Sequence, residues 1–355
     1  MAYNPDYVNC TICGLMLGGH GQWLGKVLAL AGPHWPDRRQ TPRSLKVKDE
    51  EVVCYDAQAA WTPAKYYLLP DRNEVALESE YDADRRPDDP DHVTTAKMYI
   101  GVHAACEDIA KRVMKTSPIA QIRSIGDLWL SLERRCARYT SENPTRDRNF
   151  VPPIPKSQFG QPLELGMDRY YVPYACIVQY GDEWEGWWDD DPIDIEDFTP
   201  DLIEDLEPIS KESSRLPSEL TQFQSRIEAL PQEVKDHLCT FFQDGQFSLE
   251  CNYLMPQSMW KQIFLQIPFL WDLDTKAIHD KTGTGESEIS RWNWEKITRQ
   301  VMSPAHPSPP EAYEYKDEGV WDHEEVGLEV VPGGFTNRRR IWQILEEMYP
   351  NDVQW

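Results

Sequence analysis

The sequence predicts a mixed α+β fold that is mainly helical and irregular. Apolar residues recur at helical spacing through much of the C-terminal half, from about Ser218 to Leu273. Short segments rich in β-branched and aromatic residues occur instead nearer the N-terminus. The chain also contains 28 prolines in 355 residues, which indicates many irregular connections. Together these observations predict a few short strands in the N-terminal region and a helical C-terminal region.

Residues 1–138 are predicted to form the N-terminal region. Val52–Tyr55 and Lys65–Leu69 have the composition of strands and are bounded by turn residues. Within Tyr99–Met114, apolar residues at helical spacing predict a helix, and Ile125–Arg138 has the pattern of a second amphipathic helix. The region is therefore expected to combine short strands with at least these helices.

Residues 139–208 are predicted to be a proline-rich and acidic linker. About half of Asp182–Glu207 is Asp or Glu, and Trp184, Trp187 and Trp188 interrupt the acidic run. A solvated linker is the simpler interpretation, because like charges repel and hold such a chain open. The alternative is a strip of acidic and aromatic residues that docks a partner.

Residues 209–355 are predicted to be helical. At Leu230-Pro231, proline suits a first helical position because its missing N–H would be unpaired there. One apolar helix face follows, formed by Val234, Leu238 and Phe241 or Phe242. A second apolar helix is predicted to open at Pro256. The chain closes with a predicted helix from about Asn337, with three apolar residues on one face: Ile341, Leu345 and Met348.

Several of these segments together resemble an F-box and a family of filamentous-fungal F-box-domain proteins. Those segments are Leu230-Pro231-x-Glu233-Val234, Ser258-x-Trp260, Pro268–Asp274, Asn337–Trp342, Cys10–Gly14 and Val102–Cys106. The resemblance covers most of the chain. It departs from the F-box pattern between the two helices, where Gln243–Asn252 stands in place of a leucine-rich middle helix. Gly245 and its polar neighbours disfavour a regular helix there.

The resemblance implies an adaptor that works by binding and has no catalytic residues. The F-box-like region would dock on the Skp-type adaptor of a cullin–RING (SCF-type) ubiquitin ligase, and another surface would recruit an unknown substrate protein. The residues expected at the adaptor surface or in its immediate support are Leu230, Pro231, Val234, Leu238 and Trp260. Because some of them also belong to the helical hairpin, the alternative is an ordinary hairpin whose apolar stripe is core.

Cysteine spacing near the N-terminus predicts a metal site. Cys10-x-x-Cys13 is a knuckle in which two thiolates can grip one tetrahedral ion. His103 and Cys106 can complete the site, because positions three apart on a helix face the same side. Four protein ligands leave no open position, so the predicted cofactor is a structural zinc ion that ties the N-terminal region together.

Other interpretations of these residues remain open. Cys54 and His20 are substitute ligands for the same ion. In a protein without metal, Cys106 would pack as a small apolar residue and the CxxC thiols would be free. A thioredoxin-like redox role is a third interpretation, and it requires a CxxC that follows a strand and opens a helix.

Composition limits the classes of partner. The net charge is −24 and the pI is about 4.7, which argues against nucleic acid and anionic membranes because both are bound by clustered Lys and Arg. The dense basic run Arg338–Arg340 is expected to pair with internal acidic groups or to cap a structural feature. With no apolar run of about 18–20 residues, no evident signal peptide and no disulfide-like cysteine pattern, the chain is expected in the cytoplasm or nucleus.

Three hypotheses for function follow from the sequence. The first is the F-box-like recruiting adaptor. The second is a structural or interaction protein that keeps a degenerate F-box without ligase assembly, which the irregular segment between the two helices favours. The third is a zinc-dependent enzyme of unknown class, which would need an exchangeable water and fewer than four protein ligands on the metal. No nucleophile elbow, phosphate-binding loop or H-E-x-x-H motif occurs to support catalysis.

Overall fold

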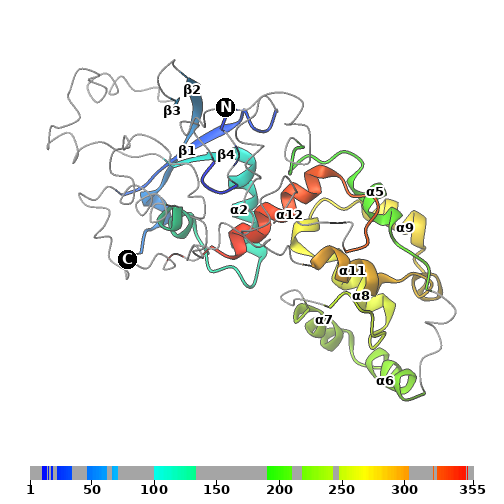
Figure 1. Ribbon diagram of the computed structural model, residues 1–355. Coiled ribbons are helices and arrows are strands. Elements are labelled where there is room, and N and C mark those ends of the chain that lie inside the picture. Colours follow the sequence, from blue (N-terminus) through cyan, green and yellow to red (C-terminus); the bar gives the residue numbers. More distant parts are fainter. Residues whose placement is uncertain are drawn as a thin grey trace, which may run out of the picture. The chain divides into compact units, whose positions relative to one another are not determined.

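A computed structural model describes residues 10–13, 15, 17–18, 22–33, 46–61, 66–70, 100–132, 190–209, 218–242, 248–303, 323, 326–348 and 350. The chain divides into two compact units. Unit 1 comprises Met1–Ile193, His306–Val320 and Arg340–Trp355, and unit 2 comprises Asp194–Ala305 and Trp321–Arg339. The described elements are mainly helices with one small antiparallel sheet, which confirms the predicted mixed, mainly helical class (Figure 1).

The sheet of unit 1 has four strands in the order β3-β2-β1-β4. The strands are β1 (Val27–Ala31), β2 (Val53–Trp61), β3 (Tyr66–Pro70) and β4 (Ile100–His103), and all neighbours are antiparallel. Strand β1 is central: its first residue, Val27, lies opposite Ala57 on one side and His103 on the other. The two strands predicted from sequence are β2 and β3, and β1 and β4 are additional.

Helix α2 (Ala104–Thr116) follows β4 directly and covers the core of unit 1 with Ile109 and Val113, both fully buried. This is the helix predicted within Tyr99–Met114, and the residues before it, Ile100–His103, form a strand that the sequence did not predict. Their β-branched residues Ile100 and Val102 suit β4 better than a helix. Residues 125–132 form a further helix, as predicted, and residues 133–138 of that prediction lie outside the described part.

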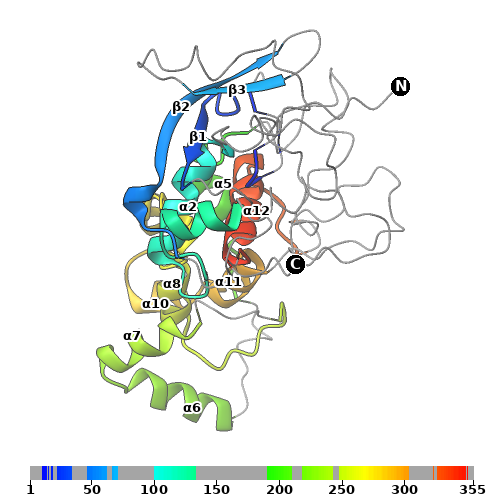
Figure 2. The ribbon, with the colours of Figure 1, turned by 90° about the vertical axis from the view of Figure 1, so that its left-hand side faces the viewer.

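Unit 2 is helical. Its elements are α5 (Phe198–Glu204), α6 (Ser218–Glu228), α7 (Gln232–Thr240), α8 (Gln257–Leu265), the 3-10 turn η6 (Pro268–Leu270), α9 (Thr275–Thr282), α10 (Glu286–Ile289), α11 (Trp294–Met302) and the first part of α12 (Gly333–Glu346). Helices α8 and α11 form its centre, where the rings of Phe264 and Trp294 lie 5.6 Å apart. Figure 2 shows α6 and α7 following one another through a short turn.

Local sequence explains where these helices begin. Helices α7 and α8 start directly after Pro231 and Pro256, which are their N-cap residues, so Pro231 lies one position before the predicted first helical position. The Asp274 and Asn293 side chains cap α9 and α11 by accepting backbone N–H bonds from Lys276 and Lys296. Helix α12 begins at Gly333, four residues before the predicted start at Asn337.

The acidic linker interpretation is wrong for the described part of Asp182–Glu207. Residues 198–204 form α5, and Phe198, Leu202 and Ile203 are buried. Phe198 packs against Phe335, with the ring centroids 5.1 Å apart. Within α5 the two acidic residues are Asp201, which is half-buried, and Glu204, which is exposed, so the high Asp and Glu content of the segment hid the apolar face of this helix. The remainder of the predicted linker, residues 139–189, lies outside the described residues.

Candidate metal centre

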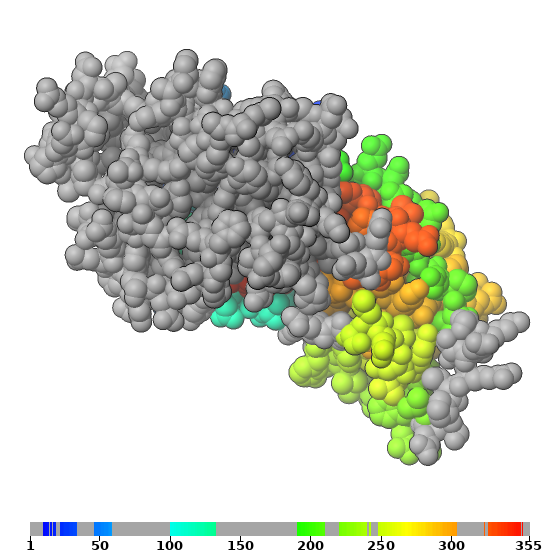
Figure 3. Space-filling view, in the orientation of Figure 1, coloured from blue at the N-terminus to red at the C-terminus, as the bar shows by residue number. Residues whose placement is uncertain are grey.

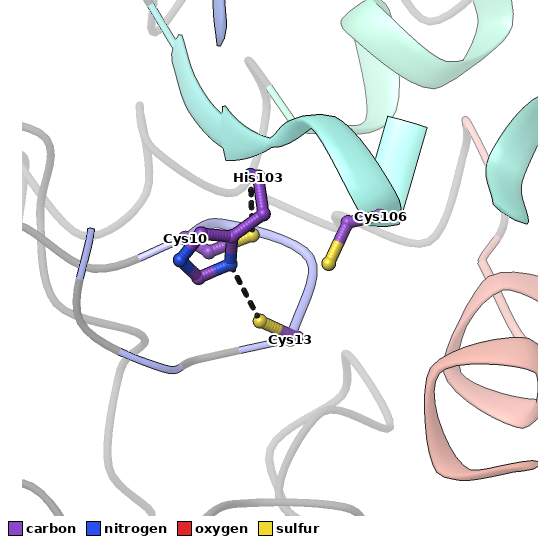
Figure 4. A group of neighbouring side chains, drawn as sticks. All are labelled: Cys10, Cys13, His103 and Cys106. Atoms are coloured by element: carbon purple, nitrogen blue, oxygen red, sulfur yellow. Dashed lines mark hydrogen bonds between the residues drawn. The ribbon is translucent and has the colours of Figure 1, made fainter. Parts of the chain in front are cut away.

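Four side chains from two distant parts of the sequence meet inside unit 1. Cys10, Cys13, His103 and Cys106 are each fully buried, and their ligand atoms all lie within 4.8 Å of one another. Figure 4 shows the three thiols and the imidazole pointing toward a common centre. These are the four residues that cysteine spacing predicted, and together they form a buried tetrad compatible with a metal ion.

The knuckle is held in place by backbone hydrogen bonds to strand β4. The backbone N–H of Cys10 donates to the Leu15 carbonyl at 2.8 Å and closes the turn. Both the backbone N–H and the hydroxyl of Thr11 donate to the Gly101 carbonyl, at 3.1 and 3.2 Å. The knuckle is therefore positioned by the fold itself, before any ligand atom is considered.

The second pair of residues lies at the junction of a strand and a helix. His103 is the last residue of β4 and the N-cap of α2, and Cys106 lies in the first turn of α2. The sequence analysis placed both on one helix. The change of backbone direction at His103 nevertheless brings the two side chains to the same side. The junction is fixed by the Ala104 N–H, which donates to the Lys26 carbonyl at 2.8 Å beside the start of β1.

The two pairs contact each other directly. Cys13 Sγ lies 3.3 Å from His103 Nδ1, and the backbone N–H of His103 donates to Cys10 Sγ at 3.5 Å. The indole of Trp23 packs edge-on against the imidazole, with ring centroids 4.9 Å apart. These contacts restrict the imidazole to one orientation, with Nδ1 directed at the thiols.

Without a metal ion, the group favours charge separation between Cys10 and His103. Burial raises the pKa of Cys10, but hydrogen bonds from Cys106 and Cys13 and the charge on His103 outweigh it, leaving this pKa well below the usual value. Burial lowers the pKa of His103, but the charges of Cys13 and Cys10 outweigh it and raise this pKa to about 10. Burial, together with hydrogen bonds to Cys10 and Cys13, raises the pKa of Cys106 well above the usual value. A metal cation that binds here displaces the protons held by the thiols and the imidazole.

The dimensions of the tetrad suit a tetrahedral ion. Bonds of 2.3 Å to sulfur and 2.0–2.1 Å to nitrogen place tetrahedral ligand atoms about 3.6–3.8 Å apart. The four ligand atoms here lie within 4.8 Å of one another, so small side-chain rotations would bring them to that spacing. Three sulfurs and one nitrogen are soft or borderline donors, which select late transition metals over magnesium or calcium. Such an arrangement can hold an ion in a closed site that stabilises the fold.

Cys54, one of the two alternative ligands, is not part of this group. Cys54 lies on β2 and is only partly screened from solvent; this partial desolvation of its thiol, together with the nearby Glu107, raises its pKa to about 11. His20 lies outside the described residues. Residues 11–13 form turns, so the CxxC does not open a helix as a thioredoxin-like motif would.

The five residues predicted at the adaptor surface take different positions in unit 2. Pro231 and Val234 are exposed, Leu230 and Leu238 are half-buried, and Trp260 is buried. Trp260 lies at the centre of unit 2, where its ring contacts Phe242 at a centroid distance of 5.6 Å. It therefore supports the hairpin and is not itself on the surface.

Helix α7 packs on α8 with only part of the predicted apolar stripe: Phe242 contacts Trp260, whereas Val234 and Phe241 are exposed. Cys239 is buried against α8, with its Sγ 4.0 Å from the Met259 carbonyl. Asp236 accepts hydrogen bonds at 2.7 Å from the side-chain amides of Gln232 and Gln262, which link the two helices at their exposed edge. The stripe of Val234, Leu238 and Phe241 is not the buried face, and Phe241 is 66% exposed.

Comparison of the chain with known protein families, with curated proteins and with solved structures gives no match. Among the described residues, no helix combines the length and the apolar character that crossing a membrane requires.

Sequence reasoning missed one residue that touches the metal centre. Arg340 donates a hydrogen bond from Nη2 to the backbone carbonyl of Cys13. Its partner is 327 residues away, and a backbone carbonyl leaves no trace in sequence. The available signal was the basic run Arg338–Arg340 beside apolar residues in a strongly acidic chain.

Proposed function

We propose that this protein is a binding protein without catalytic activity: an F-box-like adaptor that recruits a substrate protein to an SCF-type ubiquitin ligase, built around a structural zinc ion. The observation that carries the proposal is the solvent-facing apolar stripe of α7. If the stripe served only as core, it would face α8, whereas Val234 and Phe241 face solvent.

The stripe has the character of a docking surface. Val234 is 42% exposed, Phe241 66% and Phe223, on the preceding helix α6, 46%. These are three of the six large apolar side chains that are strongly exposed among the described residues. Exposed apolar side chains on adjacent helices are typical of protein interaction sites. Residues of the segment that contains α6 and α7 reach the surface in Figure 3.

The partner in this proposal is the Skp-type adaptor. The stripe begins at the Leu-Pro opening that carries the F-box resemblance, and Leu230 and Leu238 are half-buried at its edges. Apolar anchors surrounded by polar residues such as Glu233 and His237 fit a partner that offers an apolar groove with a polar rim. The substrate would bind elsewhere on the chain.

The zinc part of the proposal rests on the donor set. Three thiols and one imidazole, all fully buried, match closed structural zinc sites. Four protein ligands leave no position for a reactive water, which disfavours the zinc-enzyme alternative. Metal analysis of the purified chain tests for the structural zinc ion. About one zinc per chain is expected, and Cys13→Ser or Cys106→Ser should abolish zinc binding. Full occupancy in both serine variants would contradict it.

Binding of the full chain to a purified Skp-type adaptor at micromolar concentration tests the adaptor role. Val234→Glu and Phe241→Glu should each weaken binding roughly tenfold or more, because a charge is placed in an apolar contact. Val53→Glu is the matched control, since Val53 is 43% exposed but lies on β2 in unit 1. Circular dichroism confirms that each variant folds. No binding by the folded wild type would rule out the adaptor role.

A second candidate function is an interaction protein that does not assemble a ligase. The residues that favour it lie between α7 and α8, where the F-box pattern has a helix. The described part of that connection, residues 248–256, contains no helix. It is held instead as an extended loop by Glu295, which accepts backbone hydrogen bonds from Asn252 and Tyr253. This candidate predicts a partner for the same α7 stripe and no affinity for the Skp-type adaptor.

A further inference from the structure

Arg340 is buried beside the metal centre. It lies in helix α12, within the part of that helix that belongs to unit 1, and its side chain is 1% exposed. Its guanidinium donates from Nη2 to the backbone carbonyl of Cys13, the residue whose Sγ belongs to the tetrad. A permanently charged group has thus been placed inside the protein at the CxxC knuckle.

The charge of a loaded centre accounts for a cation at this place. A zinc ion carries two positive charges, while the three cysteines supply three thiolates and the histidine is neutral. The loaded centre therefore has one excess negative charge, and all four of its ligands are fully buried. A buried charge is costly unless an opposite charge accompanies it. The guanidinium of Arg340 supplies one positive charge at the knuckle.

The same stretch of α12 also contacts helix α2, at the end of that helix opposite to Cys106. Glu346 accepts hydrogen bonds from Ser117, the C-cap of α2, at 2.8 Å and from the Trp342 indole at 2.7 Å. Helix α2 carries Cys106 in its first turn. Residues 340–346 of α12 therefore hold the knuckle at one end and the helix that carries the second ligand pair at the other.

We infer that Arg340 is the counter-charge and positioning residue of the zinc centre, so that the C-terminal part of α12 completes a site whose ligands lie in the first third of the chain. The inference rests on the proposed structural zinc ion. It assigns Arg340, the last residue of the Arg338–Arg340 run, a role that differs from that of its neighbours.

Those neighbours provide matched controls. Arg339 is also buried on α12, but its guanidinium donates to the carbonyls of Val301, Met302 and Ser303 in unit 2, at 3.2, 3.1 and 2.7 Å. Arg339→Gln removes a buried cation from the same helix without touching the metal centre. Arg340→Gln removes the charge but keeps a hydrogen-bond donor, and Arg340→Lys keeps the charge but loses the planar fork.

The test is the zinc affinity of the full-length variants, measured by competition with a chromophoric chelator. Arg340→Gln should weaken zinc binding roughly 10- to 100-fold, the usual effect of losing a partner that supports metal ligands. Arg340→Lys should retain most of the affinity, and Arg339→Gln should leave it unchanged. Cobalt substitution gives a second readout, because the thiolate-to-cobalt absorption band reports whether all three sulfurs still bind the metal.

The outcomes separate the two levels of the proposal. If the wild type binds no zinc, the zinc centre itself is wrong. If the wild type binds zinc and Arg340→Gln binds it equally well, the counter-charge role is overturned while the centre stands. Equal losses in the Gln variants of Arg339 and Arg340 would show a general effect of helix stability and would also overturn it. Should Arg340→Gln not fold, Arg340→Lys decides, because a full loss of zinc-dependent stabilisation with the charge retained contradicts the inference.

Discussion

Arg338 and Asp272 form a two-pronged ion pair inside unit 2. Nη1 and Nη2 of the arginine lie 2.6 and 2.7 Å from the two carboxylate oxygens. The guanidinium of Arg338 also lies over two aromatic rings. It is 3.9 Å from the ring centroid of Trp271 and 5.1 Å from the ring centroid of Phe198. Arg338 is fully buried, whereas the Asp272 side chain is 30% exposed. The pair thereby fixes the first turns of α12 on the segment that follows η6.

Asp272→Asn should destabilise the protein strongly. The substitution leaves the buried charge of Arg338 without its carboxylate, and breaking a buried pair in this way costs about 3–5 kcal/mol; the lower end is expected because Asp272 is part-exposed. Urea unfolding followed by tryptophan fluorescence measures the change. Glu50→Gln is the control, because the Lys48–Glu50 pair is 3.9 Å long and 74% exposed on both sides. That change should cost less than about 0.5 kcal/mol, and similar costs for both variants would contradict the interpretation.

Glu295→Gln should release the loop between α7 and α8. Glu295 is fully buried and accepts backbone hydrogen bonds from Asn252 at 2.9 Å and Tyr253 at 2.8 Å, while Arg299 pairs with the same carboxylate at 2.8 Å. The loop needs this support because Tyr253 has a positive φ of 53°.

An amide at position 295 offers one acceptor oxygen and leaves Arg299 without a counter-ion, so a loss of about 2–4 kcal/mol is expected. Faster hydrogen exchange at the amides of Asn252 and Tyr253 should accompany it. Glu288→Gln, which alters an exposed carboxylate that accepts from Gly285 N–H at 3.1 Å, is the control. Unchanged exchange at Asn252 and Tyr253 in Glu295→Gln would refute the proposed role of the carboxylate.

The link between α7 and α8 should weaken in acid. Hydrogen bonds from Gln262 and Gln232 hold the pKa of Asp236 below its ordinary value of 3.8. A carboxylate with a depressed pKa adds stability that is fully present above the unfolded-state pKa and is lost as the pH falls through the lower folded-state pKa. Unfolding by urea at pH 5 and pH 3 should therefore show a decrease in wild-type stability that is smaller in Asp236→Asn. The same decrease in both proteins would exclude Asp236 as its source.

The sequence predicted the ligand tetrad because metal chemistry restricts residue type and spacing. Cys10 with Cys13, and His103 with Cys106, are each recognisable as local pairs, and the fold brings both pairs together. The strand–helix junction at His103 was not predictable in this way. It depends on β4 pairing with β1, which is a contact between residues distant in sequence.

The α7 stripe shows a second limit of prediction from sequence. Periodicity identified Val234, Leu238 and Phe241 as one helix face but could not tell whether that face is core or surface. Which face of α7 is buried depends on its contacts with α8. The small Cys239 packs against α8, and Asp236 accepts a hydrogen bond from Gln262 of α8. The basic run behaved as expected: Arg338 pairs with Asp272, and Arg339 caps the carbonyl end of α11. The partner of Arg340 could not be read from sequence, because it is a backbone carbonyl.

Removal of the metal should lower the stability of the protein. A ligand that binds only the folded state stabilises it by RT ln(1 + [L]/Kd), about 4 kcal/mol when the free ion is present at 1,000 times Kd. Excess chelator should thus lower the unfolding temperature by several degrees, and zinc in excess of the chelator should restore it. The serine variant Cys106→Ser should unfold at the lower temperature with or without chelator. Magnesium should not replace zinc, because it prefers oxygen ligands. A wild-type transition that does not respond to chelator would contradict a stabilising metal in the tetrad.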